Sequence, residues 1–269
     1  MAALTTEDPL SLQVLQAGCG LFVIWMLVGE LKGDGLRYSK FAKAAGLIWP
    51  SRLGMAVMLF PSFLLSCAFL LLNLSHSPLL PPSSSTTTRL LLTASALSLH
   101  FGKRLLEVLF IHKYSGSMEA KMSILVSCAY AAATGLILFA QQVAAEKGKS
   151  PPVDLMKWGI GLFVVGITGN FYHHYLLSTL RSDKKPSNST SQYKIPEGGL
   201  FRWVVCPHYL FESIGFLGIA LIAQTFSAFV IALGMSASLC ARSYKTKDWY
   251  LKKIDGFPAD RKPFFPFLF

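Results

Sequence analysis

Charge is scarce in this chain of 269 residues, and acidic charge is the scarcer sign. Asp, Glu, Lys and Arg together make up 14% of the residues, whereas hydrophobic residues make up 52%. Soluble globular domains carry about 25% charged residues, so the composition excludes an ordinary soluble protein. It indicates a polytopic membrane protein.

Paired cysteines are also absent. No CxxC pair occurs and no His/Cys spacing is typical of a zinc site, so we predict no metal centre. A GxGxxG motif after a predicted strand is missing too, which excludes a Rossmann dinucleotide site. The five cysteines all fall in apolar segments, where we expect small buried side chains: Cys19, Cys67, Cys128, Cys206 and Cys240.

Basic residues outnumber acidic ones by 25 to 14, which gives a net charge of +11. They lie in loops between apolar segments, without interleaved aromatics or a recognised motif, so we exclude nucleic acid as a partner. Their distribution predicts a lumenal N-terminus and a cytosolic C-terminus by the positive-inside rule. Residues 1–11 hold no Lys or Arg, so we expect the first apolar segment to be retained as an anchor.

Long apolar runs are what the sequence has in abundance. A transmembrane helix needs about 20 mostly apolar residues. The qualifying segments lie near residues 12–31, 54–73, 90–112, 122–144, 158–179, 203–223 and 225–241. No stretch between them is long enough to form a domain outside the membrane.

The third, fifth and sixth segments carry polar side chains in the half that we predict to lie nearer the cytosol. These are His100, Lys103, Arg104, Glu107, Asn170, Tyr172, His173, His174, His208 and Glu212. Each has a structural explanation by itself, since Glu107 can pair with Lys103 on the same helix. Intramembrane ionisable residues usually face a water-filled or ligand-filled space. We therefore predict an all-α polytopic membrane protein whose seven transmembrane helices enclose a cytosol-facing cofactor cavity.

The predicted cytosolic edge of this cavity is basic. The residues concerned are Arg181, Lys184, Lys185, Lys194 and Arg242. Guanidinium and ammonium groups are the usual partners of phosphate, so the edge suits a phosphorylated nucleotide. The apolar bilayer side suits a lipophilic substrate. Membrane topology alone also explains the basic edge, and composition by itself favours that explanation.

Five blocks in the sequence carry a family likeness. They are LHFGKRLLEVLFIHKYSGSM (99–118), GNFYHH with the following LLSTLR (169–181), YKIPEGGLF (193–201), CPHYLFE (206–212) and ARSYKTKDWYLKKIDGFPADRKPFFPFLF (241–269). Together they resemble the steroid 5α-reductase family, whose other branch is the trans-2-enoyl-CoA reductases. A weaker likeness runs through PSRLGMAVMLFPSF (50–63). The resemblance divides the chain into an N-terminal membrane region, 1–89, and a C-terminal domain, 90–269.

This resemblance implies a multi-pass enzyme of the endoplasmic reticulum membrane. Such an enzyme moves hydride from NADPH to the β-carbon of a conjugated carbonyl. Carried over by position, the residues implied to contact NADPH are Asn170, His174, Arg181, Tyr193, Lys194, His208, Glu212, Arg242 and Tyr250. The steroid branch commonly has Arg at the position of Lys194 and Asn at the position of His208.

The substrate end departs from the steroid branch. A Glu before PSF and a Tyr after the third-helix His hold the steroid 3-oxo group there, and this chain has Phe60 and Phe101 instead. Neither can donate a proton, although a positioned donor normally polarises the carbonyl. We assign Phe60, Phe101 and Glu107 to the substrate side, and His100, Lys103 and Tyr172 as the candidate catalytic donors.

The leading functional hypothesis is NADPH-dependent reduction of a 3-oxo-Δ4-steroid to the 5α-reduced 3-oxosteroid. Its first alternative is a trans-2-enoyl-CoA reductase of very-long-chain fatty-acid elongation, which the KRLLEVLF and CPHYLFE blocks resemble more closely. The EGGLF block resembles the steroid branch more closely. A second alternative is a non-catalytic lipid-binding relative, and the sequence leaves the oligomeric state open.

Overall fold

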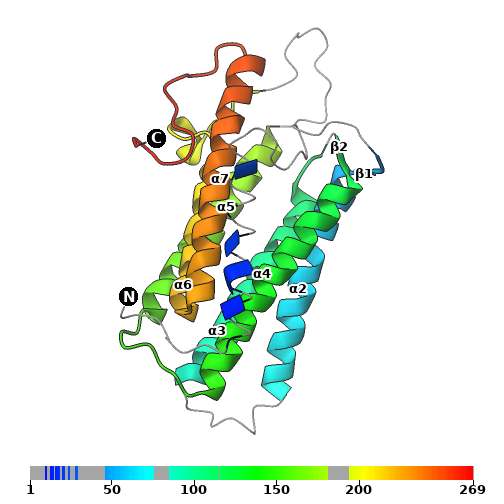
Figure 1. Cartoon of the computed structure of the whole chain (residues 1–269). Helices are drawn as coiled ribbons and strands as arrows, with labels where there is room; N and C mark the ends of the chain where they lie inside the picture. Colours follow the sequence, from blue (N-terminus) through cyan, green and yellow to red (C-terminus); the bar gives the residue numbers. More distant parts are fainter. Residues whose placement is uncertain are drawn as a thin grey trace.

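Long helices packed side by side form the bundle of this protein (Figure 1). The computed structural model describes residues 46–75, 85–114, 116–180 and 194–268, with scattered helical residues between 10 and 29. The long helices are α2 (Ser51–Ser75), α3 (Ser85–Leu106), α4 (Ala120–Glu146), α5 (Met156–Thr179), α6 (Pro207–Ala223) and α7 (Phe226–Lys253).

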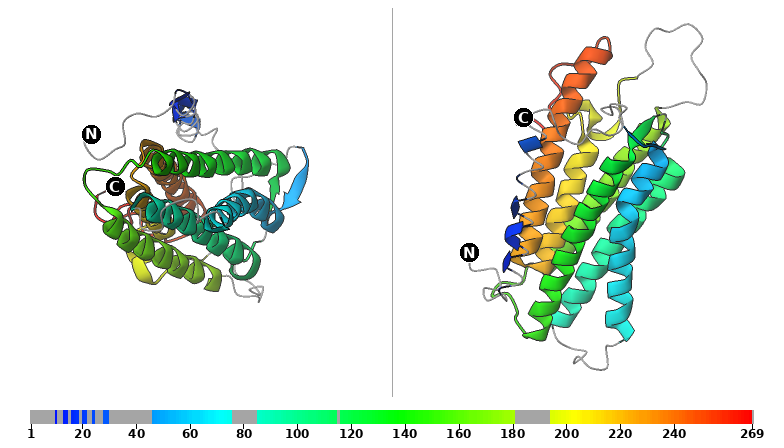
Figure 2. Two further views of the ribbon diagram at one scale, coloured as in Figure 1. Left: turned by 90° about the horizontal axis from the view of Figure 1, so that it is seen from below. Right: turned by 45° about the vertical axis from the view of Figure 1, so that its right-hand side comes forward.

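Three of the described helices, α2, α4 and α7, are long and apolar enough to cross a membrane. Helix α6 is apolar but shorter, with 17 residues. The protein is thus a helical membrane protein, and the count of seven spans stays a prediction. The predicted 12–31 segment lies largely outside the described residues. Its described residues run beside α7 (Figure 2), where Gln16 Nε2 donates to Ser227 Oγ at 3.0 Å.

Consecutive helices alternate in direction (Figure 1). The C-terminal ends of α3 and α5 therefore lie at the same end of the bundle as the N-terminal end of α6. The segment after α7 also folds back at this end. This alternation gives late residues of α3 and α5 the same depth as early residues of α6.

Two helices differ in extent from the predicted membrane segments. The apolar pattern predicts a segment that ends at Ala241, and α7 continues beyond it to Lys253. Hydropathy falls after Ala241, yet most of the following polar residues have adequate helix propensity, so the helix outlasts its apolar part. Helix α6 begins at Pro207 instead of near residue 203, because proline is favoured in the first helical turn.

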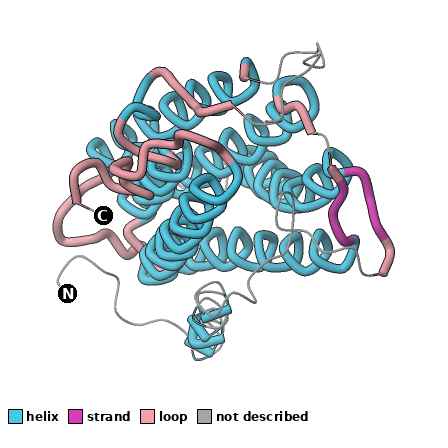
Figure 3. Tube along the Cα trace, turned by 90° about the horizontal axis from the view of Figure 1, so that it is seen from above, coloured by secondary structure: helices cyan, strands magenta, loops and turns pink. Residues whose placement is uncertain are grey.

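A small antiparallel sheet, which the sequence did not predict, joins two helix starts (Figure 3). Strand β1 (Ile48–Pro50) leads into α2, and β2 (Ser117–Glu119) leads into α4. Met118 of β2 is buried under α2 at Gly54. A Cβ at Gly54 would overlap the Met118 Sδ, so a larger residue there would require the Met118 side chain to shift.

Glycines bring the backbones of α5 and α6 close together. A Cβ added at Gly166 would lie 2.3 Å from the backbone nitrogen of Gly215. The absence of side chains lets the two helices touch along their backbones, as small residues do in membrane helix pairs. Asn170 follows Gly166 by about one helical turn on the same face of α5. The glycine contact therefore sets the position of Asn170 against α6.

Candidate active site

Four polar side chains follow one face of α3 near its end. His100, Lys103, Arg104 and Glu107 are spaced i, i+3, i+4 and i+7, which places them on neighbouring turns of the same face. The Glu107 side chain is 1% exposed and that of Lys103 is 13% exposed. Lys103 Nζ lies 3.1 Å from Glu107 Oε1. An ion pair is thus built into an otherwise apolar helix bundle.

Helices α5 and α6 supply the partners of Lys103. Its ammonium donates to the amide oxygen of Asn170. The Asn170 amide nitrogen donates to the His208 carbonyl at 2.8 Å and to Glu212 Oε2 at 3.4 Å. Asn170 and Glu212 are both buried. Asn170 therefore links α3 to the first turns of α6.

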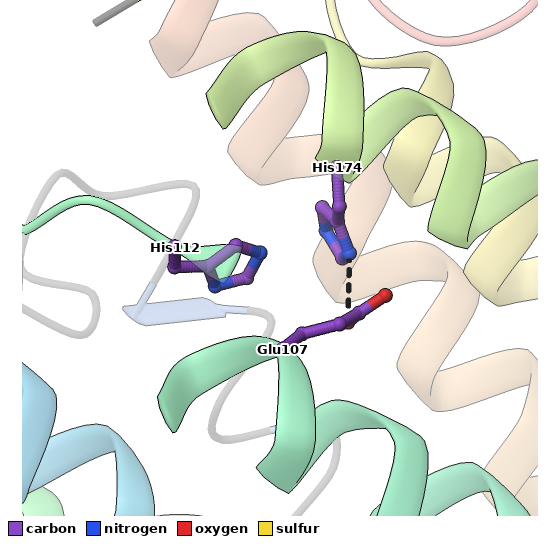
Figure 4. Close-up of side chains that lie close together, drawn as sticks. All are labelled: Glu107, His112 and His174. Carbon is purple, nitrogen blue, oxygen red and sulfur yellow. Dashed lines mark hydrogen bonds and ion pairs between the residues drawn. The ribbon is translucent and has the colours of Figure 1, made fainter. Parts of the chain in front are cut away.

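The second cation of α3, Arg104, lies against His174 of α5. Arg104 Nη1 is 3.1 Å from Glu107 Oε2 and 3.0 and 3.2 Å from the two His174 ring nitrogens. Since one nitrogen is close to both, the guanidinium lies over the imidazole ring. His174 Nδ1 is 3.0 Å from Glu107 Oε2 and donates to it (Figure 4). We call Lys103, Arg104, Glu107, Asn170, His174 and Glu212 the site cluster.

A π-helical turn, η3 (Glu107–Ile111), ends α3 beside this cluster. It is closed by a bond from the His112 N–H to the Glu107 carbonyl at 2.7 Å. The wider turn brings His112 back over Glu107, and its ring meets that of His174 at a centroid distance of 4.8 Å. Tyr114 OH lies 2.9 Å from His112 Nδ1. π-turns of this kind are frequent at functional sites.

Residues 194–206 form a lip over the end of α5. His173 Nδ1 donates to the Gly169 carbonyl at 2.7 Å, and its Nε2 accepts the Leu200 N–H at 3.0 Å. Gly199 has φ 49° and sits so close that a Cβ there would lie 2.7 Å from His173 Nε2. His173 thus holds the EGGLF block on α5.

The C-terminal segment closes against this lip. The Val205 N–H donates to the Lys262 carbonyl at 2.8 Å, and the Lys262 N–H donates to the Trp203 carbonyl at 2.9 Å. Arg261 Nη1 donates to the Pro196 carbonyl at 2.7 Å. The YKIPEGGLF and tail blocks, far apart in sequence, are therefore one structural unit.

The structure separates the three candidate catalytic donors. Lys103 lies in the site cluster, whereas Tyr172 is 48% exposed with its ring at the edge of His173. His100 is buried between the rings of Phe101 and Phe216, at centroid distances of 5.1 and 4.7 Å. Of the three, only Lys103 combines burial with contacts to α5.

The substrate-side pair of phenylalanines is not brought together. Phe101 is 3% exposed and packs in the main core near Tyr130. Phe60 is 51% exposed on α2. Phe63, one turn later, is the α2 ring that meets α3, at Gly102. The third residue of that prediction, Glu107, belongs to the site cluster.

Of the remaining residues predicted to bind cofactor, His208 lies next to the cluster, with its ring 5.3 Å from that of His174 between centroids. Tyr250 and Ile195, the neighbour of Lys194, pack against the small core of Val205, Cys206, Ile254 and Phe257. Arg242 is buried on α7, two turns before Tyr250. Arg181 and Tyr193 lie outside the described residues.

Two residues of this region received no specific role from the sequence. Arg104 was among the polar residues predicted to face the cavity, and its spacing on the face of His100 and Glu107 could have assigned it to the site. His112 gave no comparable signal, because an ideal α-helix would turn it away from Glu107 and only the π-turn brings it back.

The cluster can neutralise and hydrogen-bond a polar ligand within apolar surroundings. Its two cations suit phosphate or carbonyl oxygens, and its amide and second carboxylate suit an amide or hydroxyl group. Glu107, His112 and His174 also each offer a ligand atom within 4.8 Å of the others, a spacing that a metal ion could use.

Comparison with known proteins assigns the chain to a family. Residues 119–269 match the family described as 3-oxo-5-alpha-steroid 4-dehydrogenase. The chain belongs to this family. The 3-oxo-5-alpha-steroid 4-dehydrogenase match contains α4 to α7, and hence Asn170, His174 and Glu212, whereas Lys103 and Glu107 precede it.

Individual relatives come from both branches. A very-long-chain enoyl-CoA reductase of Dictyostelium discoideum is 29% identical over 210 residues, covering 77% of this chain and 66% of the relative. Mouse 3-oxo-5-alpha-steroid 4-dehydrogenase 1 is 36% identical over 110 residues, covering 41% of each chain. Steroid 5-alpha-reductase DET2 of Gossypium hirsutum is 36% identical over 137 residues, covering 49% and 51%. The matches thus span between two fifths and two thirds of these relatives' lengths.

Proposed function

We propose that this protein is an NADPH-dependent membrane reductase that acts on the C=C bond of a conjugated carbonyl lipid. The observation that carries the proposal is the buried ion network of α3, α5 and α6, in which Lys103 bridges Glu107 and Asn170. Buried ionisable groups in membrane helices are costly and mark functional sites. Relatives named as reductases and dehydrogenases of enoyl-CoA and 3-oxosteroids support the same reaction class.

The donor set of the site fits NADPH. Arg104 offers a guanidinium group for phosphates, and we propose that Arg242 and Lys194 contribute further cationic groups. Asn170 can donate and accept hydrogen bonds and Glu212 can accept them, which suits a carboxamide or a ribose hydroxyl. When bound, NADPH supplies a hydride for the β-carbon of the substrate.

Lys103 performs the complementary proton chemistry. Its ammonium hydrogen-bonds the carbonyl oxygen and stabilises the enolate charge that develops there. It then gives up one proton, so that the α-carbon ends with a new C–H bond. Glu107 and Asn170 hold Lys103 in place, and the apolar helices exclude water from the site. Phe60 and Phe101 cannot polarise the carbonyl, because neither side chain has a hydrogen-bond donor.

For the substrate, we propose a 3-oxo-Δ4-steroid, with a long-chain trans-2-enoyl-CoA as the second candidate. One observation favours the second. The match to the enoyl-CoA reductase covers more residues than 119–269 contain, so it extends into the helices before β2. The steroid relatives match shorter stretches. We place the protein in the endoplasmic reticulum membrane, where both kinds of lipid are handled.

The test uses membranes from a host that lacks both activities and expresses the full chain. NADPH oxidation is followed with a 4-en-3-one steroid and, separately, with a long-chain trans-2-enoyl-CoA. Reduction of either confirms the reaction class and identifies the substrate. If neither is reduced and NADPH does not bind, the reductase proposal is wrong and a lipid-binding relative remains.

Cofactor contacts are tested by Glu212→Gln, with Glu146→Gln as the matched control. Glu146 is exposed at the far end of α4. We expect the NADPH concentration for half-saturation to rise by about tenfold or more in Glu212→Gln only, as for the loss of a charge-assisted contact. An unchanged value would remove Glu212 from the cofactor site.

A further inference from the structure

We propose that His112, His174 and Glu107 form a proton relay that resupplies Lys103 from the aqueous end of the bundle. This inference rests on the proposed function, because it serves the proton that Lys103 gives to the substrate. Chains of His and carboxylate groups are a recurrent way to move protons inside membrane proteins. The relay assigns a role to the π-turn, which the reaction itself does not require.

The outer part of the relay begins where the chain leaves the bundle. His112 is half-buried and is followed directly by Lys113, which is exposed and whose charge favours an aqueous position. Tyr114 OH lies 2.9 Å from His112 Nδ1. The rings of His112 and His174 meet edge to face at an interplanar angle of 85° (Figure 4). Their nearest ligand atoms lie within 4.8 Å, a gap that one water molecule can bridge.

The inner part consists of direct contacts. His174 Nδ1 donates to Glu107 Oε2 at 3.0 Å, which leaves His174 Nε2 as the acceptor of the neutral ring. Glu107 Oε1, the other carboxylate oxygen, lies 3.1 Å from Lys103 Nζ. Nε2 also lies 3.2 Å from Arg104 Nη1, so a proton enters there when this contact opens. The ring then releases its Nδ1 proton to Glu107 Oε2, and rotation of the protonated carboxyl group presents that proton to Lys103 Nζ.

The proton count requires that Lys103 be reprotonated after each turnover. Each turnover transfers one hydride and one proton to the substrate, and leaves Lys103 as a neutral amine. The Lys103 side chain is 13% exposed and that of Glu107 is 1% exposed. A substrate in contact with Lys103 would cover it further. Reprotonation then follows the buried contacts: His112 or a water gives a proton to His174, His174 gives one to Glu107, and Glu107 gives one to Lys103.

A metal ion at the same three residues is the competing explanation. Glu107 already contacts two cations, the ammonium of Lys103 and the guanidinium of Arg104. A divalent ion would add two positive charges next to them, and Arg104 already lies over the His174 ring. Coulomb repulsion at these distances disfavours the ion, so we assign the geometry to proton transfer.

The relay is tested with His112→Gln in the full-length protein, because this change leaves Lys103 and its direct contacts in place. His76→Gln is the matched control, since residue 76 falls between α2 and α3 in the sequence and belongs to neither the site cluster nor the relay. Rapid mixing with NADPH and the reducible substrate separates the first turnover from the steady state. The first turnover of His112→Gln should stay within about twofold of the wild-type rate, because Lys103 starts protonated.

The steady-state kcat of His112→Gln should fall by about tenfold or more, with unchanged KM values and a larger solvent deuterium effect. Added imidazole should restore part of this loss. Equal losses in first-turnover and steady-state rates, or no loss at all, would overturn the relay while the reductase proposal stands. One zinc ion per wild-type chain that is lost in His112→Gln would also overturn it. A wild-type protein without reductase activity would instead refute the function on which the relay rests.

Discussion

Two buried polar clusters lie at opposite ends of this bundle, and they differ in the charged groups that they offer to a ligand. The site cluster joins late residues of α3 and α5 to early residues of α6. The Arg89 cluster, defined as Arg89, Gln141, Asp154 and Gln224, joins the other ends of α3, α4, α5 and α6. Arg89 Nη1 donates to the Ile222 carbonyl at 2.6 Å and to Gln224 Oε1 at 2.9 Å. The Gln141 amide donates to the Ala223 carbonyl.

Most partners in the Arg89 cluster are backbone carbonyls or side chains at the ends of helices. Gln224, in the left-handed conformation with φ 49°, ends α6, and its amide donates to the Val153 carbonyl at 2.8 Å. The sole carboxylate of the Arg89 cluster, Asp154, is half-exposed. The site cluster instead combines two cations, two carboxylates and a histidine. The comparison indicates that the Arg89 cluster stabilises the connections, whereas the site cluster supports chemistry.

The largest expected effect separates the clusters by activity. Lys103→Met should lower kcat by about 100-fold or more, because it removes the proton donor, while the protein still folds. Arg89→Met, the matched control, should retain the kcat of its folded fraction. Turnover per folded protein, with folding checked by size-exclusion chromatography in detergent, measures the difference. Comparable kcat losses in both variants would show that the clusters are not functionally distinct.

The next effect concerns the glycine contact that positions the site cluster. Gly166→Val should destabilise the protein by about 3 kcal/mol or more, because the new side chain overlaps the Gly215 backbone. Gly161→Val is the control, since nothing lies within 4 Å of a Cβ there. Thermal unfolding in detergent compares the two. Equal melting temperatures would contradict the close packing of α5 on α6.

A smaller effect is expected from the Arg89 cluster itself. Arg89→Met should destabilise the protein by about 2 to 4 kcal/mol, because the Ile222 carbonyl and the Gln224 side chain lose a buried donor. Thermal unfolding again measures it. A melting temperature equal to that of the wild type would show that the Arg89 cluster does not hold the helix ends together.

The smallest effect is pH-dependent. The Met156 N–H, followed by the Arg89 guanidinium, holds the pKa of the Asp154 carboxyl below its ordinary value. A lowered folded pKa stabilises the protein above the ordinary value of about 3.9, and this contribution is lost as the pH falls further. Because Asp154 is half-exposed, Asp154→Asn should cost less than about 1 kcal/mol at pH 7. The melting-temperature difference from the wild type should shrink below pH 4; a constant difference would exclude this ionisation as its cause.

Much of the bundle was predictable because apolar length and helix direction are local properties. The segments at 54–73, 122–144 and 158–179 match α2, α4 and α5 to within a few residues at each end. The depth of Lys103, Asn170 and Glu212 followed from counting residues along alternating helices. The end of α7 was not predictable in this way, because hydropathy indicates which residues can cross a membrane and not where the helix ends.

By itself, the sequence determined that the helices are apolar, that their polar residues gather toward one end, and that five blocks resemble one reductase family. Tertiary structure alone decided which of these residues meet. It joined Lys103 to Asn170 across α3 and α5, left Tyr172 exposed, separated Phe60 from the core that holds Phe101, and turned His112 over Glu107. The reason is physical: spacing fixes which side chains share a helix face, but helix rotation, a glycine contact and one π-turn fix what that face touches.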